Sequence, residues 1–206
     1  MDDTSADEIP ETLVITLDPP IEVNKALFAE LSLREPTLSQ VRDAHMKLDD
    51  AGLPSIGAQR EYELAFVAAV SGKPRIVVDA LPVRVLREAV GYLESWVKAP
   101  LLDVADEIET RLTVELSPPL KGPSGGEVHE LVLREPTGGE MRKAEDLLGK
   151  QSVPLPGPVR RYQARLIELV AGVSPWVVGQ LPISKSKEAI RFLEGFERSA
   201  QATGTR

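Results

Sequence analysis

The chain repeats itself at an interval of one hundred residues. The segment Glu30–Thr37 returns as Glu130–Thr137 with seven of its eight positions identical, and the register holds nearly to the end of each half. Residue types that recur at this interval include Arg42, Pro54, Gly57, Arg60, Tyr62, Gly72, Leu81, Pro82, Leu93 and Glu94. Solenoid repeats are about 20 to 50 residues long, whereas about 100 residues is the usual size of a domain. The sequence therefore predicts two tandem copies of one small domain.

The repeat divides the 206 residues into two copies and three short polar segments. We expect the copies at 11–98 and 111–198, each large enough for one modest core. Residues 1–10 are acidic and predict a disordered leader. Residues 99–110 predict an acidic linker, and 199–206 a disordered tail.

Bulk properties exclude several classes of protein. No apolar run approaches the roughly 18 residues that a membrane span needs, and the acidic N-terminus does not resemble a signal peptide. The formal charge of −8 argues against nucleic-acid binding, which needs basic patches. The absence of cysteine excludes disulfides and suits a cytosolic protein. We expect neither a membrane nor a nucleic acid as partner.

Two strands open each copy. Residues 12–17 are rich in β-branched side chains and lead into Pro19 and Pro20, which predicts a strand that ends there. Residues 112–116 repeat it. Residues 27–34 and 128–134 predict a second strand, and the connection of about nine residues predicts a loose β-hairpin.

An Arg-Glu-Pro-Thr junction then changes the period from two to 3.6. Proline ends the strand, and the spacing of Thr37 with Gln40, and of Thr137 with Glu140, predicts a capping box in both copies. Helices are expected at 39–50, 59–70 and 83–97, with a short apolar turn at 76–78. The second copy predicts helices at 139–150, 159–170 and 183–197. The fold class is therefore α+β and mostly helical: two ββααα domains, each a hairpin followed by three helices.

The order of these motifs resembles a known family. A strand that leads into Pro-Pro, a strand that closes in Leu-Arg-Glu-Pro-Thr and a last helix that ends in an aromatic residue (Trp96, Phe196) are similar to the tail assembly chaperones of contractile-tailed phages, the tail protein E and Mu-like group. The resemblance covers about 85 residues twice, although family members usually carry one such domain. It implies a non-enzymatic phage or prophage protein of the host cell cytoplasm. It also implies binding to the tape-measure protein, with the tail tube protein as a second candidate partner, and absence from the finished virion.

Two sets of residues are candidate partner-binding sites. Arg34 with Glu35, and Arg134 with Glu135, could form strand-end salt bridges or contact a partner beside an exposed hairpin edge. Tyr92 and Trp96 lie at i and i+4 on the last helix, where the second copy has Phe192 and Phe196. These aromatics could belong to the core, to a groove for a helical client or to an interface between the domains.

Catalytic and metal sites are not expected. His45 corresponds to Glu145 and His129 to Ala29, so neither histidine is kept in both copies. The chain has no cysteine and no serine-elbow motif, and the Gly122–Gly126 segment lacks the spacing of a dinucleotide loop. We therefore predict no enzyme activity, cofactor or metal.

The alternative function is a structural or adaptor protein, either a virion component or a scaffold, built from two pseudo-symmetric domains that pack on each other. Self-association and avidity between the copies are further possibilities. The second copy could also present a basic face to an acidic partner segment, formed by Arg160, Arg161, Arg165, Lys185, Lys187 and Arg191.

Overall fold

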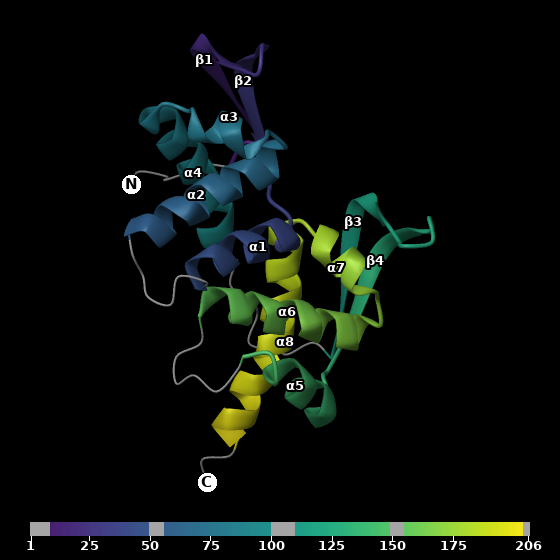
Figure 1. Cartoon of the computed structure of the whole chain (residues 1–206). Coiled ribbons are helices and arrows are strands. Elements are labelled where there is room, and N and C mark those ends of the chain that lie inside the picture. The colour runs from purple at the N-terminus through teal and green to yellow at the C-terminus, as the bar shows by residue number, and fades with distance from the viewer. Residues whose placement is uncertain (1–8, 50–55, 100–109, 149–154, 204–206) are drawn as a thin grey trace, which may run out of the picture.

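Each half of the molecule is a β-hairpin followed by helices (Figure 1). The computed structural model describes residues 9–49, 56–99, 110–148 and 155–203. Most of the expected leader, linker and interhelical loops lie outside these ranges. The first repeat contains β1 (Thr12–Val23), β2 (Ala26–Arg34), α1 (Leu38–Asp49), α2 (Ile56–Ser71), α3 (Arg75–Asp79) and α4 (Val83–Lys98). The second contains β3 (Arg111–Lys121), β4 (Glu127–Arg134), α5 (Gly138–Glu145), α6 (Pro156–Ala171), α7 (Pro175–Gln180) and α8 (Ile183–Thr203).

The predicted fold class is confirmed: the chain is α+β, mostly helical and duplicated. The expected apolar turn of each copy is itself a short helix, α3 or α7. Ser174 begins α7 by accepting a hydrogen bond from the Val177 N–H. Val177 and Val178 are buried, as are Val77 and Val78 in α3. Burial of these apolar pairs holds helices too short to be stable alone.

The proline pairs do not end the first strands, contrary to expectation. β1 continues through a cis Asp18–Pro19 bond and β3 through a cis Ser117–Pro118 bond. The antiparallel register of β1 with β2 shifts between Thr16 and Ile21, and pairing then resumes. The prolines lie in this irregular segment, so their missing N–H groups leave the ladder intact on both sides.

The first hairpin is tight, so the prediction of a loose connection is wrong there. Val23 pairs with Ala26, and the two intervening residues, Asn24 and Lys25, have φ values of 51° and 66°. Two residues with positive φ match the right-handed twist of the strands they join. The second hairpin has a longer loop, closed by a hydrogen bond of 2.7 Å from the Gly122 N–H to the Gly126 carbonyl.

Two helix ends differ from the prediction. α5 stops at Glu145 rather than near 150, and the next residues form tighter turns in which the Leu147 and Leu148 N–H groups bond to the carbonyls of Ala144 and Glu145, three residues back. α8 continues to Thr203, whereas the sequence predicted its end near 197. Residues 198–203 contain neither glycine nor proline, so no helix breaker interrupts this segment.

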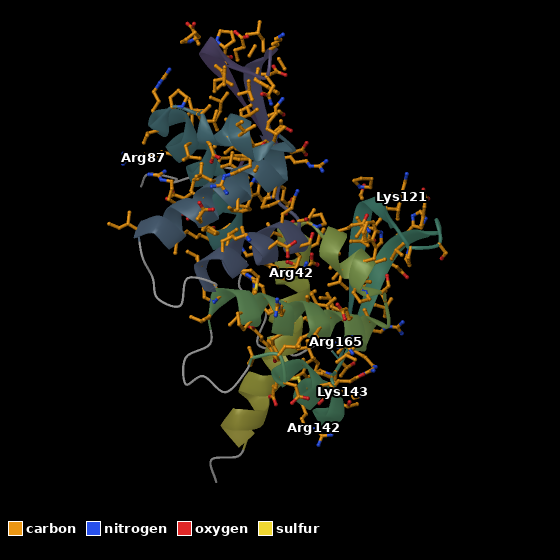
Figure 2. All side chains as sticks on the ribbon, in the orientation of Figure 1. Arg42, Arg87, Lys121, Arg142, Lys143 and Arg165 are labelled. Carbon is orange, nitrogen blue, oxygen red and sulfur yellow. The ribbon has the colours of Figure 1, made fainter. Side chains whose placement is uncertain are left out.

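The two repeats share one hydrophobic core. Buried residues from both halves form a single cluster, and α1 of the first repeat lies between α2 and α6 (Figure 1). The basic side chains labelled in Figure 2 lie on the outside of this body. The two repeats therefore pack together as one unit rather than forming two separate domains.

Replacing Thr137 with alanine is expected to lower the free energy of unfolding by about 1 kcal/mol, the usual cost of a lost N-cap. Its hydroxyl accepts from the Glu140 N–H at 3.3 Å, and the Glu140 carboxylate accepts from the Thr137 N–H at 2.8 Å. Urea denaturation measures the change. Ser124→Ala, in the exposed hairpin loop, is the control, and equal stability of both variants would contradict a capping role.

Candidate protein-binding surfaces

The Arg-Glu-Pro-Thr junction of the second repeat is closed on itself. Arg134 forms a two-pronged ion pair with Glu140, with N–O distances of 2.6 and 2.9 Å. This guanidinium, with the Thr137 backbone and hydroxyl donors, lowers the pKa of Glu140 to about 2. Glu135 is exposed beside it. Arg134 therefore supports the start of α5.

The same junction in the first repeat faces the second repeat. Glu35 accepts a hydrogen bond of 2.6 Å from the Ser184 N–H at the start of α8. Arg34 instead lines a pocket of about 400 Å³ between the open edge of the hairpin and the end of α2, together with Thr12 and Gln40. Within the described residues, no ion pair joins Arg34 to Glu35. The equivalent arginines thus have different surroundings.

A short backbone ladder joins the two repeats next to Glu35. The Leu38 N–H donates to the Leu181 carbonyl at 2.8 Å, and the Ile183 N–H donates to the Pro36 carbonyl at 2.9 Å. Thr37 and Pro182 form the antiparallel bridge between them. The Thr37 cap at the start of α1 uses Gln40, whose Oε1 accepts from the Thr37 N–H at 2.9 Å. The strand-to-helix junction of one repeat is therefore held by the junction before α8 of the other.

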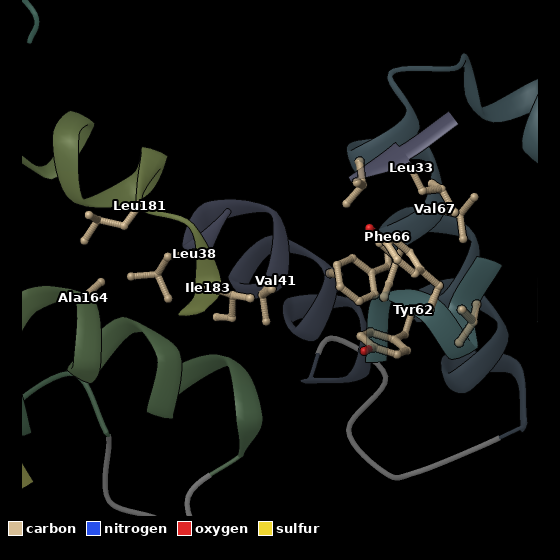
Figure 3. Packing of buried hydrophobic residues seen from close by; sticks show 14 of the residues in the cluster. Leu33, Leu38, Val41, Tyr62, Phe66, Val67, Ala164, Leu181 and Ile183 are labelled. Carbon is tan, nitrogen blue, oxygen red and sulfur yellow. The ribbon is translucent and has the colours of Figure 1, made fainter. Parts of the chain in front are cut away.

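Apolar side chains fill the space around this ladder. Leu38 points toward Ala164, Leu181 and Ile183 of the second repeat (Figure 3). Leu38 is 2% exposed, and Leu181 and Ile183 are fully buried. Deeper in the first repeat, Phe66 and Val67 continue the same core (Figure 3).

A lysine ties the two last helices together. Lys187 of α8 donates to the carbonyl of Trp96 at 3.2 Å and also to that of Ala99, at the end of α4. A cation suits this position, since carbonyls at a helix C-terminus carry partial negative charge. Burial nevertheless lowers the pKa of Lys187. The basic face considered for the second copy thus contributes Lys187 to the contact between repeats, and Arg160 of the same face acts electrostatically on His45 of the first repeat.

The aromatic pairs of the last helices are partly committed to the fold. Tyr92 is buried and donates its hydroxyl hydrogen bond to the Pro10 carbonyl at 2.8 Å. It meets Trp96 edge-on, as Phe192 meets Phe196, with ring centroids 6.5 and 5.2 Å apart. Trp96 and Phe192 are half-buried against the shared core. These residues pack the helices, and Trp96 also borders the second repeat.

His45 lies beside the contact between repeats. Its ring stacks on Tyr62 with centroids 5.3 Å apart, and its Nδ1 is buried without a hydrogen-bond partner. Burial, reinforced by the charge of Arg160 and partly offset by Glu94, lowers the pKa of His45 to about 4. His129 lies on the exposed second hairpin. Within the described ranges, no three His, Cys, Asp or Glu residues are grouped as metal ligands would be.

Sequence comparison decides the family. The family described as "Phage tail assembly chaperone proteins, E, or 41 or 14" matches twice, over residues 14–97 and 113–198. The chain belongs to the phage tail assembly chaperones. No match was found among curated proteins or among solved structures. Each match covers one hairpin with its helices, so this chaperone is a tandem duplication of the family domain.

Most residues of the contact between repeats in this tail assembly chaperone were not singled out by the sequence, although an interface between the domains was one reading of Trp96. Leu38, Ile183 and Lys187 carry it, yet none is a candidate site by motif. A signal was present in the comparison of copies, because Leu38 has become Gly138. No helix in the described ranges combines the length and apolar character of a membrane span.

Proposed function

We propose that this chaperone binds the tape-measure protein in the host cell cytoplasm during tail assembly and is absent from the finished virion. Membership of the family, established separately over each repeat, is the observation that carries the proposal. The protein contributes no chemical step and needs no cofactor. Its task is to hold a long, partly assembled client, with the tail tube protein as a possible second partner.

The open hairpin edges are the surfaces best suited to the client. Each described sheet has only two strands, so an extended client segment can add as a third strand. Leu27 is 71% exposed and Val14 is 55% exposed on the first hairpin. The pocket lined by Arg34 lies at the base of that hairpin and can receive an acidic or polar client side chain.

Two hairpins in one rigid body offer avidity. Once one hairpin holds the client, the second meets it at an effective concentration on the order of millimolar. Because the repeats share a core, deleting one would expose Leu38 or Ile183 and disturb the other. Point substitutions on the hairpins therefore test avidity more cleanly than deletions do.

Quantitative mass spectrometry of assembly intermediates and finished particles tests this proposal. We expect the protein in intermediates that contain the tape measure. The ratio of this protein to tube protein should then be more than about tenfold lower in finished particles than in those intermediates. The shared core favours one second candidate, a rigid structural adaptor. Stoichiometric presence in finished particles would support that candidate and contradict the chaperone cycle.

A further inference from the structure

The contact between the repeats is not two-fold symmetric, because the two repeats contribute different surfaces to it. The first repeat contributes Glu35–Ser39 and α1, and the second contributes α6, α7 and Leu181–Ser184. A two-fold relation would also place Glu135–Gly139 on Leu81–Arg84. Instead, Gly138 is exposed and Val83 is 55% exposed, whereas Ile183, the equivalent of Val83, is fully buried. α5 lies at the opposite end of the molecule from α3 (Figure 1).

One unused copy of each half-interface therefore remains. We call Glu135–Gly139 with α5 the donor surface, and α2, α3 and Leu81–Arg84 the acceptor surface. We propose that the donor surface of one molecule docks on the acceptor surface of a second copy of this chain, reproducing the contact between repeats. The Gly138 N–H would then meet the Leu81 carbonyl, and the Val83 N–H the Pro136 carbonyl.

Side-chain sizes on the two free surfaces are matched to each other. Inside the molecule, the large Leu38 of the donor side packs toward the small Ala164 of the acceptor side (Figure 3). On the free surfaces the equivalents are Gly138 and Leu64, so the large and small residues have exchanged sides. An apolar side chain would thus occupy the same space from the other partner, which preserves packed volume.

A second pair shows the same exchange. A Cβ placed on Gly179 would lie 3.4 Å from the Cβ of Ser39, an ordinary van der Waals distance, so a small residue stands on each side of a close contact here. The equivalent residues on the free surfaces are Asp79 and Gly139. The glycine has moved to the donor side, where it leaves room for the aspartate. Two compensating exchanges at neighbouring positions indicate surfaces that meet each other.

The charges are also complementary. Glu35 reaches Ser184 within the molecule, and the equivalents on the free surfaces are Glu135 and the exposed Arg84. His45 lies within the electrostatic influence of Arg160, and their equivalents are Glu145 and Arg60. Arg60 already pairs with Glu63 at 2.7 Å but is exposed and retains further N–H donors. Both cross-pairs bring opposite charges together.

One contact cannot recur in the same form. Lys187 binds carbonyls at the end of α4, whereas α8 continues past the equivalent position to Thr203. The exposed Arg87, on the face of the first repeat shown in Figure 2, replaces Lys187 on the acceptor side. A donor-to-acceptor contact is heterologous, so it adds molecules into a ring or a helical chain rather than stopping at two.

Sedimentation velocity on the full chain, over concentrations up to about 1 mM, tests the proposal. We expect species larger than two copies as concentration rises. Val83→Asp blocks the acceptor surface, and Gly138→Asp blocks the donor surface. Both positions begin helices, where aspartate is favourable, and a Cβ on Gly138 meets no atom within 4 Å. Ser124→Asp, in the exposed loop of the second hairpin and outside both surfaces, is the control because it adds the same carboxylate.

For each blocked variant alone, the dissociation constant for self-association should rise by more than about tenfold, because docking would bury an unpaired carboxylate. An equimolar mixture of the two variants should form a complex of two copies and no larger, since each supplies the surface the other lacks. Ser124→Asp should behave as the unmodified chain. A chain that stays monomeric throughout, or a mixture that does not associate, would overturn the proposal.

Discussion

Truncating Ile183 to alanine is expected to lower the free energy of unfolding by about 2–5 kcal/mol, the range for large-to-small substitutions in a core. Ile183 is fully buried where the second repeat meets Leu38 and Val41 of the first (Figure 3). Its main chain also supplies one of the two backbone–backbone hydrogen bonds that join the described parts of the repeats. The substitution removes packing without removing that hydrogen bond. Urea denaturation, with the slope compared between variants, measures the effect.

The duplication supplies the control for this prediction. Val83 occupies the equivalent position and is 55% exposed, so Val83→Ala is expected to change stability by no more than about 0.5 kcal/mol. The comparison is made at low protein concentration, where no second molecule covers Val83. Equal effects at the two positions would mean that the repeats do not pack on each other in solution.

Acidification is expected to destabilise the protein through His45, whose folded-state pKa is lowered from 6.5 to about 4. Between those values the unfolded chain binds a proton that the folded chain rejects, so stability is full above pH 6.5 and falls as pH decreases toward 4. Since the side chain is not fully enclosed, we expect a loss of about 1–2 kcal/mol between pH 7.5 and 5.

Substitution of His45 by glutamine should remove this part of the pH dependence. His129→Gln, on the exposed hairpin, should leave the profile in place. Glu140, whose pKa is lowered from 4.5 to about 2, contributes stability that is lost mainly below pH 4.5, so measurements above pH 5 report on His45 with little contribution from Glu140. A profile for His45→Gln that is as steep as that of the unmodified chain would exclude His45 as the cause.

Most of the fold is predicted by sequence features that the two copies share. The shared Leu-Arg-Glu-Pro-Thr segment placed the change from strand to helix correctly, because proline and a capping threonine act locally. The proline pairs were misread because a shift of register removes them from the ladder, and register depends on the partner strand. The extension of α8 past the position where α4 ends belongs to the second copy alone, so comparison of the copies could not predict it.

The contact between repeats escaped prediction for the opposite reason. Comparing copies favours residues that are retained, whereas this contact uses residues that differ: Leu38 against Gly138, and Ala164 against Leu64. A domain that binds its own duplicate through unlike surfaces must place equivalent residues in different surroundings. Glu35 and Glu135 show the result, since one bonds Ser184 and the other is exposed.

Co-expression with the tape-measure protein of the same phage tests the central claim most directly. The quantity to measure is the fraction of tape-measure protein that stays soluble and co-purifies with this chain, with light scattering giving the stoichiometry. We predict a stable soluble complex and a tape measure that is insoluble when expressed alone. A tape measure that remains insoluble while this protein elutes by itself would contradict the account.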